Sequence, residues 1–378
     1  MATLLRNLRP VGRADAIDLA IGDDGRVLPP GSPADKVIDA GGARVSAGWV
    51  DLHQHVYWGA TDISIRASEG GARTGVTTIV DAGSAGEANF HGFRGYVVEP
   101  SVEQVLAFLN IGSIGLVACN RVSELIDARS IDVDRTLAVI EANRDVIRGV
   151  KVRASGVILG AWGMTPVHVA RKVARVTGLP LMVHVGEMPP TIEEILDVLV
   201  PGDIVTHCFH GKRGGNLLED PALFERARRM QAEGLVLDIG HGFASFAYDT
   251  ARRALDLGLK PTTISTDLHA RNIGGPVWDL PLVMSKMLVL GLTLEEVVAM
   301  VTDAARRAVG EPVCDPYAPG AFARLTVFDV ADADLTLPDS MGRTLRLDRR
   351  IRPRLTVIGA RVVEAGSNLS FAAAGDAF

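Results

Sequence analysis

The most constraining feature of this sequence is a regular alternation of short apolar runs and helical patterns between residues 48 and 267. Eight of the runs have the length and residue types of β-strands: 48–55, 76–81, 112–118, 149–153, 180–185, 203–208, 235–240 and 262–267. Helical patterns lie between them, such as the one that opens at Thr165-Pro166 and stops at Gly178. Eight strand–helix units in about 220 residues predict the α/β class and a closed (β/α)8 TIM barrel.

The rest of the chain reads differently. An open, doubly wound sheet is the competing fold for the middle, but no G-x-G-x-x-G loop follows the first strand. At the two ends, short β-like runs alternate with turns, as at Gly22-Asp23-Asp24-Gly25, and residues 325–328 and 355–358 are strand-like. We therefore expect a barrel at residues 48–312 and a small β-sandwich domain built from residues 1–47 and 313–378.

Composition excludes several classes of protein. The net charge is −6 and no long basic run occurs, so nucleic acid is not an expected partner. The three cysteines lack paired spacing, which argues against a disulfide framework and for a reducing compartment. No apolar run reaches about 18 residues, so we expect no membrane span, no signal peptide and a cytoplasmic location.

Candidate metal ligands stand at the ends of the predicted strands. The first strand ends in Asp51-Leu52-His53-Gln54-His55, and alternation in a strand places His53 and His55 on one face, where two imidazoles can clamp a metal. Four further candidates lie at the carboxyl ends of other strands, where barrel enzymes place their catalytic groups. They are Lys151, His184, His207 and Asp267. Two residues before each of these stand Gly149, Met182, Val205 and Ser265, which we expect to fill the barrel below the site.

At this point the chain resembles the amidohydrolase superfamily of metal-dependent hydrolases, over nearly its whole length. The resemblance rests on three segments: Ile38-Asp39-Ala40-Gly41-Gly42 leading to Gly48-Trp49-Val50-Asp51-Leu52-His53-Gln54-His55, Val301-Thr302-Asp303-Ala304-Ala305-Arg306, and Gly320-Ala321-Phe322-Ala323-Arg324-Leu325. It implies two divalent metal ions, expected to be Zn²⁺, bridged by Lys151 carboxylated on its amine. His53, His55 and Asp267 would hold the first metal, and His184 and His207 the second.

The resemblance also implies a mechanism that the chemistry of the residues supports. A lysine beside two dications is disfavoured as an ammonium, and its neutral amine can take up CO₂. Two metals roughly 3.5–4 Å apart can share a hydroxide, which would attack an acyl carbonyl. Asp267 would be the catalytic residue that takes up the hydroxide proton and delivers it to the leaving group.

Substrate-binding candidates follow from the positions around these strands. Tyr57 stands where dihydroorotases have an Arg that binds the substrate carboxylate, and His241 follows the seventh strand. Lys212 and Arg213 lie in a Gly-rich segment after the sixth strand, and Arg271 lies just after Asp267. Each could bind an anionic small molecule. Alternatively, Lys212 and Arg213 belong to a solvent-exposed flexible loop with no role in binding.

Because Tyr57 replaces that Arg, the pattern looks closest to a dihydroorotase-like deacetylase subgroup. Its implied substrates are small acetylated carboxylic acids, either O-acetyl esters of 2-hydroxy acids or N-acyl amino acids, and a homo-oligomer is common for such barrels. Three alternatives stay open. One is a dihydroorotase or another cyclic amide hydrolase. Another is a mononuclear deaminase that uses His184 and Glu187, and the last is a non-enzymatic interaction protein on the same fold.

Overall fold

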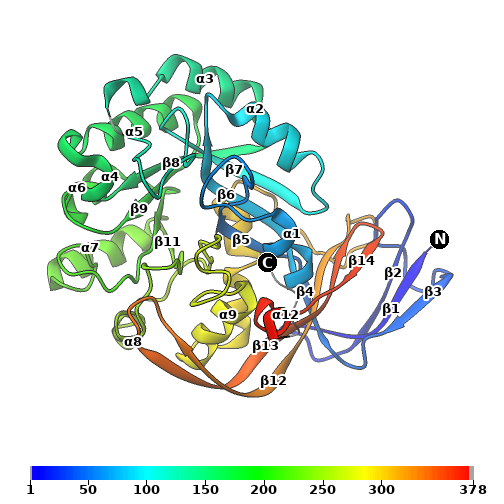
Figure 1. The fold of residues 1–378 in the computed structure, drawn as a ribbon. Helices are drawn as coiled ribbons and strands as arrows, with labels where there is room; N and C mark the ends of the chain where they lie inside the picture. The colour runs from blue at the N-terminus through cyan, green and yellow to red at the C-terminus, as the bar shows by residue number, and fades with distance from the viewer. Residues whose placement is uncertain (1, 126, 374–378) are drawn as a thin grey trace.

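The computed structural model describes residues 2–125 and 127–373, and within them a parallel sheet of seven strands forms most of a barrel (Figure 1). In spatial order the strands are β11 (Val236–Asp238), β10 (Ile204–Thr206), β9 (Leu181–Val185), β8 (Ile147–Ala154), β7 (Gln104–Asn110), β6 (Val76–Gly86) and β5 (Trp49–Gln54). Residues 263–268 join its two edges, because Thr263 bridges Asp238 of β11 and Leu268 bridges Gln54 of β5. The eighth position of the ring is thereby filled, and the predicted barrel fold is confirmed.

The third strand was predicted in the wrong place. Residues 112–118 form turns, and the strand is β7, which precedes them. Gly115 has a φ of +57°, and the amide of Leu116 donates a hydrogen bond to the carbonyl of Ser84 at 3.0 Å instead of entering a ladder. Both segments are apolar, so composition alone could not say which one pairs with β6 and β8.

Helices connect the strands and pack against the outside of the barrel (Figure 1). Their local signals behave as predicted: Gly178 ends α5 in the left-handed conformation, and Thr191 and Glu194 form a capping box at α6. The α-helices are α1 (Ala67–Gly70), α2 (Phe90–Phe93), α3 (Val133–Ala142), α4 (Gly156–Leu159), α5 (Thr165–Thr177), α6 (Ile192–Val198), α7 (Pro221–Ala232), α8 (Tyr248–Asp256), α9 (Leu280–Val289), α10 (Leu294–Met300), α11 (Asp303–Ala308) and α12 (Asn368–Ala373). Shorter 3-10 or π segments are η1 (Ala72–Thr74), η2 (Arg94–Val98), η3 (Ala128–Ser130) and η4 (Gly160–Trp162).

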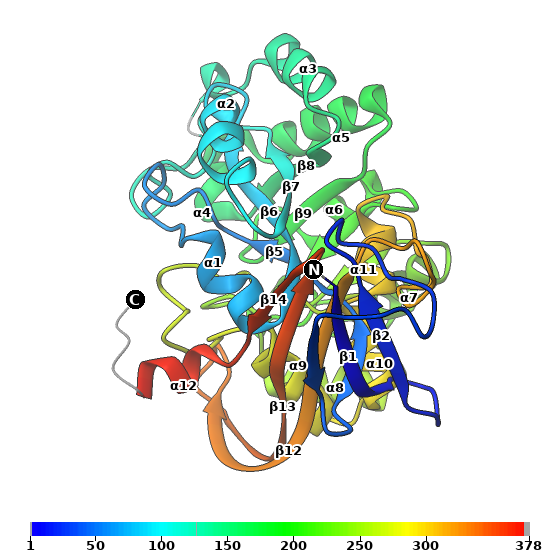
Figure 2. The ribbon, with the colours of Figure 1, turned by 90° about the vertical axis from the view of Figure 1, so that its right-hand side faces the viewer.

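Both ends of the chain meet in a second, mixed sheet beside the barrel (Figure 2). Its strands are β1 (Thr3–Pro10), β2 (Ile17–Ile21), β3 (Lys36–Asp39), β4 (Arg44–Ala47), β12 (Arg324–Pro338), β13 (Thr344–Ile358) and β14 (Arg361–Glu364). The long β12–β13 hairpin reaches past this sheet and along the barrel, where β13 packs on α9. At its tip, Asp339 accepts a hydrogen bond from the amide of Tyr248, at the start of α8.

Alternation along the barrel strands separates two cores. Leu181, Val183 and Val185 of β9 pack in the large outer cluster with the helices, whereas Met182 packs in a separate cluster inside the barrel. Met182 thus fills the lumen as predicted, but Val205 packs in the outer cluster, and that prediction was wrong. The cause lies at His207, whose φ of +72° turns its side chain inward from a position beyond the strand. Among the described residues, no helix is long and apolar enough to cross a membrane.

Candidate active site

Six side chains from five parts of the ring meet at the carboxyl ends of the barrel strands. They are the predicted metal ligands His53, His55, Lys151, His184, His207 and Asp267. Ligand atoms of His53, His207 and Asp267 lie within 4.8 Å of one another, a group that could hold a metal ion. The His184 and His207 rings lie 4.4 Å apart between centroids, and the His53 and His55 rings lie 5.3 Å apart.

Hydrogen bonding fixes which nitrogen of His53 carries a proton. The hydroxyl of Thr206 donates to the buried carboxylate of Asp238 at 2.7 Å, so the oxygen of Thr206 can only accept from Nδ1 of His53 at 2.9 Å. Burial and the charge of Lys151 hold the pKa of His53 well below its usual range, so the ring is neutral. The Nε2 atom therefore presents a lone pair, yet it faces a carboxylate oxygen of Asp267 at 3.2 Å.

His207 repeats this arrangement. Its Nδ1 lies 2.6 Å from the carbonyl oxygen of Gly240, which can only accept, so Nδ1 carries the proton. Its Nε2 is buried and has no hydrogen-bond partner among the described residues. Burial lowers the pKa of His207 to about 3, which keeps that nitrogen unprotonated. A buried, unpartnered acceptor is costly, and a cation at this point would satisfy it.

Lys151 is a buried lysine at 1% exposure, with few partners. Its Nζ lies 3.3 Å from Sδ of Met182 and 3.4 Å from Nε2 of His53. Burial lowers its pKa to about 7 against the opposing pull of Asp267 and Asp238. At neutral pH this amine is therefore a far better nucleophile than an ordinary lysine.

Asp267 sits in a strained backbone conformation, with a φ of +50°. Its carboxylate lies 3.1 Å from Nε2 of His55, and Asn272 holds its main-chain carbonyl at 2.7 Å. Although burial opposes ionisation, the neighbouring His53 and His55 hold the pKa of Asp267 well below its usual range. Asp267 is thus held as an anion, as a metal ligand or a proton acceptor must be.

A second layer of acids lies beneath and fixes these side chains. Asp81 accepts from the amide of Ser84 at 2.7 Å, and the Ser84 hydroxyl lies 2.9 Å from Nδ1 of His55. Asp51 accepts from the hydroxyl of Thr266, next to Asp267, at 2.6 Å. Outer partners of this kind set the orientation of metal-binding histidines. Taken together, the neutral rings of His53 and His207, the anionic Asp267 and the unpartnered His207 nitrogen fit a metal centre.

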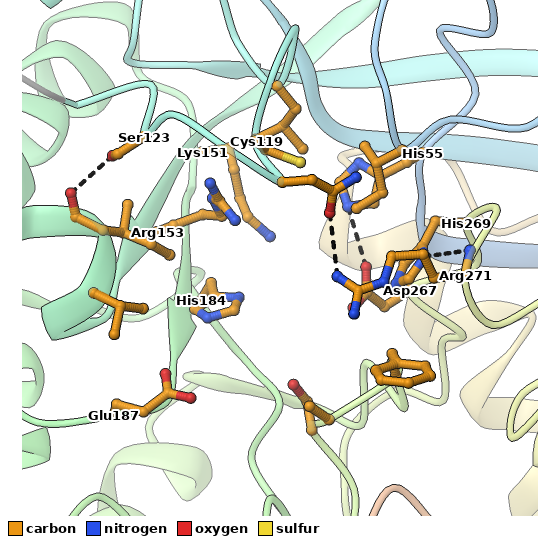
Figure 3. Close-up of a pocket in the computed structure, with 18 of the residues that line it drawn as sticks. His55, Cys119, Ser123, Lys151, Arg153, His184, Glu187, Asp267, His269 and Arg271 are labelled. Atoms are coloured by element: carbon orange, nitrogen blue, oxygen red, sulfur yellow. Dashed lines mark hydrogen bonds and ion pairs between the residues drawn. The ribbon is translucent and has the colours of Figure 1, made fainter.

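A cavity of about 570 Å³ opens above this cluster (Figure 3). In that view Lys151, Arg153 and His184 lie on one side of it, and His55, Asp267, His269 and Arg271 on the other. Two of the predicted substrate-binding residues line it, namely Lys212 and Arg271. Apolar side chains, among them Phe243 and Ile158, complete the wall, so the space suits a small molecule with both a charged and an apolar part.

The other predicted substrate-binding residues do not line this cavity. Tyr57 is buried against Phe93, and its hydroxyl donates to the carbonyl of Asn89 at 2.9 Å. The reason is that β5 ends at Gln54, so strand alternation no longer directs Tyr57 toward the lumen. His241 is fully buried behind the wall, where its Nε2 lies 2.9 Å from Nζ of Lys286. Arg213 is exposed next to the cavity residue Lys212.

Several residues that line the cavity were not predicted from the sequence. Arg153 stands two positions after Lys151 on β8 and faces the same space (Figure 3). Its guanidinium is paired with Glu124, and Cys119, Ser123 and His269 also line the cavity. The signal for Arg153 was its spacing of two from Lys151 in a strand, which places both on one face.

Glu187, the residue on which the deaminase alternative depends, has a different role in this geometry. Its carboxylate forms an ion pair with Lys212 at 2.8 Å and accepts a hydrogen bond from Ser155. Although burial opposes it, the Lys212 and Ser155 contacts lower the pKa of Glu187 to about 2. A carboxylate held ionised in this way is a poor proton shuttle near neutral pH.

Comparison with known proteins gives close relatives, although no family model matches the chain. A deacetylase of Agrobacterium fabrum is 52% identical over 372 residues, covering 96% of this chain and 91% of that protein. A deacetylase of Brucella anthropi is 50% identical, again covering 96% of this chain and 92% of the relative. A solved structure described as a dihydroorotase has 50% identity and a TM-score of 0.93, covering 97% of this chain and 98% of that one.

Proposed function

The chain belongs to the deacetylases of the amidohydrolase superfamily, and we propose that it is a two-metal deacetylase of small acetylated carboxylic acids. The observation that carries the metal part is the buried, unprotonated Nε2 of His207, which has no partner among the described residues. The lone pair on Nε2 of His53, which faces a carboxylate oxygen of Asp267, also supports a metal at this position.

The residues divide naturally between two metal positions. His53, His55 and Asp267 would hold the first metal, expected to be Zn²⁺, and His184 and His207 would hold the second. Lys151 lies beside His53 with no carboxylate or carbonyl in hydrogen-bond contact among the described residues. Carboxylation of its amine would provide an anionic bridge. When bound, the metals would polarise the acyl carbonyl and activate water at neutral pH.

The chain's own groups then carry the proton. Asp267 is the one carboxylate among the six proposed ligands, and it lies at the mouth of the barrel facing the cavity. It would accept the proton from the attacking water and deliver it to the alcohol or amine that leaves. Asp81 and Asp238, through Ser84 and Thr206, would hold the imidazoles of His55 and His53 in place, and Asp51 would hold Thr266 beside Asp267.

The proposed substrates are O-acetyl esters of 2-hydroxy acids or N-acyl amino acids. The relatives' names support acetyl transfer to water, and the cations of the cavity support a carboxylate on the substrate. Tyr57 stands at the position where a dihydroorotase is expected to have an Arg, and the Tyr57 hydroxyl donates its hydrogen bond to the carbonyl of Asn89. A phenol that cannot reach the cavity does not replace a guanidinium fork.

A side-by-side assay tests this proposal. Dihydroorotate, hydantoin, N-acetyl amino acids and O-acetyl 2-hydroxy acids are offered to the metal-loaded enzyme, and kcat/KM is measured for each. We expect the highest value for an acetylated acid and negligible hydrolysis of dihydroorotate. If dihydroorotate gives the highest kcat/KM, the chain shares the activity by which the similar solved structure is described, and the proposal is wrong.

A further inference from the structure

Several cations line the cavity, and most of them are already engaged or lie at its rim. Lys212 is neutralised by Glu187, and Arg121 has 76% of its side chain exposed. Arg271 stacks over the ring of Phe243 at 4.9 Å and donates to Asn120 at 3.2 Å. The exposure of Arg121 places it at the cavity's entrance, and Lys212 and Arg271 already have partners.

Unlike Lys212, whose partner Glu187 is 44% exposed, Arg153 pairs with a carboxylate that is only 1% exposed, and it lies beside the metal-ligand cluster. It follows Lys151 by two residues on β8, which places it on the same face and roughly 6.6 Å further toward the mouth. Its charge lowers the pKa of both His184 and Lys151, in each case after larger effects that include burial. Arg153 therefore acts electrostatically on the space where the acyl group would sit.

Glu124 holds this guanidinium in one orientation. The Nε atom of Arg153 donates to one carboxylate oxygen at 2.7 Å and Nη2 donates to the other at 2.5 Å. Glu124 itself has 1% of its side chain exposed, so the pair is fixed by the protein and not by solvent. The Nη1 atom has no acceptor among the described residues, and it keeps two N–H donors for a ligand.

A purely structural pair of the same kind exists elsewhere in the barrel, at Arg171 and Asp203. Their side chains are 18% and 2% exposed, nearly the values of Arg153 and Glu124. Asp203 also accepts from the amides of Leu181 and Val200, which tie the amino ends of neighbouring strands. This pair does not line the cavity. Removing Arg171 therefore tests the loss of a buried Arg–carboxylate pair without changing a residue that could meet the substrate.

We propose that Arg153, oriented by Glu124, binds the carboxylate of the substrate through Nη1 and selects acids acylated on the atom next to the carboxylate-bearing carbon. This inference rests on the proposed function and names the residue that gives it specificity. In such a substrate three bonds separate the acyl carbon from the carboxylate carbon. Arg153 lies on the same side of the cavity as Lys151 and His184 (Figure 3), so one group can lie over the ligand cluster while the other reaches Arg153.

The test compares Arg153→Met with Arg171→Met, using an O-acetyl 2-hydroxy acid and the carboxamide that replaces its carboxylate. For the wild type we expect a strong preference for the acid. Arg153→Met should raise KM for the acid roughly 10- to 150-fold, the range for a lost hydrogen bond to a charged group, and raise KM for the carboxamide much less. Arg171→Met should lower the melting temperature but keep the wild-type preference.

Two further measurements keep the outcomes distinct. Arg153→Lys retains the charge without the fork and should recover part of the preference, and calorimetry with the free 2-hydroxy acid should show weaker binding to Arg153→Met. A folded Arg153→Met that keeps the wild-type ratio of acid to carboxamide would overturn the role of Arg153 alone. A wild type that hydrolyses no acetylated acid would instead overturn the proposed function.

Discussion

Two aspartates at the carboxyl ends of neighbouring barrel strands have opposite surroundings, Asp238 being fully buried and the Asp267 side chain 14% exposed. Asp238 accepts three hydroxyl hydrogen bonds, from Thr206, Thr263 and Ser265, each at 2.7 Å. Asp267 faces imidazole nitrogens of His53 and His55 instead. Burial raises the pKa of Asp238, whereas that of Asp267 is lowered although burial opposes it.

Two buried lysines repeat the contrast. Nζ of Lys286, on α9, contacts the carbonyls of Pro276 at 2.7 Å and Pro338 at 2.9 Å, and it also contacts Nε2 of His241. Nζ of Lys151, inside the barrel, has a thioether and an imidazole near it. Burial lowers the pKa of both to about 7.

The number and kind of hydrogen-bond partners distinguish polar groups with a structural role from those that could bind a metal or react. Around Asp238 and Lys286 the protein supplies the partners, as the cost of burying polar groups requires. Around Asp267 and Lys151 it leaves lone pairs and an amine without such partners. The missing interactions are those that a metal ion and a bridging anion would supply.

The largest expected effect follows from exchanging the two acids for amides. Asp267→Asn keeps the shape but removes the proton acceptor, so kcat for an acetylated acid should fall about 10²–10⁴-fold. Asp238→Asn, assayed with saturating metal, should lose at most about 10²-fold, since it acts only through its neighbours. Equal losses in the two metal-loaded variants would erase the distinction between the sites. Circular dichroism checks that both are folded.

A smaller effect should separate two hydroxyls that bind the same carboxylate. Thr206→Val removes the partner of Nδ1 of His53, and we expect metal affinity to fall about 10- to 100-fold. Thr263→Val also removes a hydrogen bond to Asp238 but touches no proposed ligand, so metal affinity should change much less. Both are measured by titrating metal into chelator-treated protein. A larger loss in Thr263→Val would contradict an orienting role for Thr206.

The last prediction concerns pH and Lys286. Burial lowers its pKa to about 7 against the pull of Asp339 and Asp279, with Tyr248 and His241 also facing it. Above that pH the unfolded chain binds the extra proton, so Lys286 should add up to about 1.4 kcal/mol per pH unit to the free energy of unfolding between pH 7 and about 10. In denaturant titrations, Lys286→Met should lack this contribution, so its free energy of unfolding should rise less steeply with pH than that of the wild type. Parallel slopes for the two proteins would contradict the lowered pKa.

Much of the fold was predictable because its signals are local. The end of α5 at Gly178 and the capping box of Thr191 and Glu194 need only neighbouring residues. The proposed ligands could also be predicted from the sequence, since each stands at the end of an apolar run and barrels gather such ends at one mouth.

What the sequence could not provide depends on contacts between distant segments. Glu124 meets Arg153 because a loop after β7 folds over the mouth, and no spacing rule predicts that pairing. Tyr57 follows the two histidines in register, but the strand stops before it and the residue packs against Phe93. The misplaced third strand has the same origin, since two apolar runs compete locally and pairing with β6 decides between them.

Measuring metal content against activity decides whether deacetylation by this protein needs two divalent ions per chain. The protein is purified without chelator, its divalent ions are counted per chain, and deacetylation is followed as metal is removed and returned. We expect about two ions per chain and loss of activity on chelation. Activity should recover as metal is added back, and the recovery should saturate at two equivalents of metal. Full deacetylase activity with no divalent ion, or with a reproducible single ion per chain, would contradict this requirement for two metals.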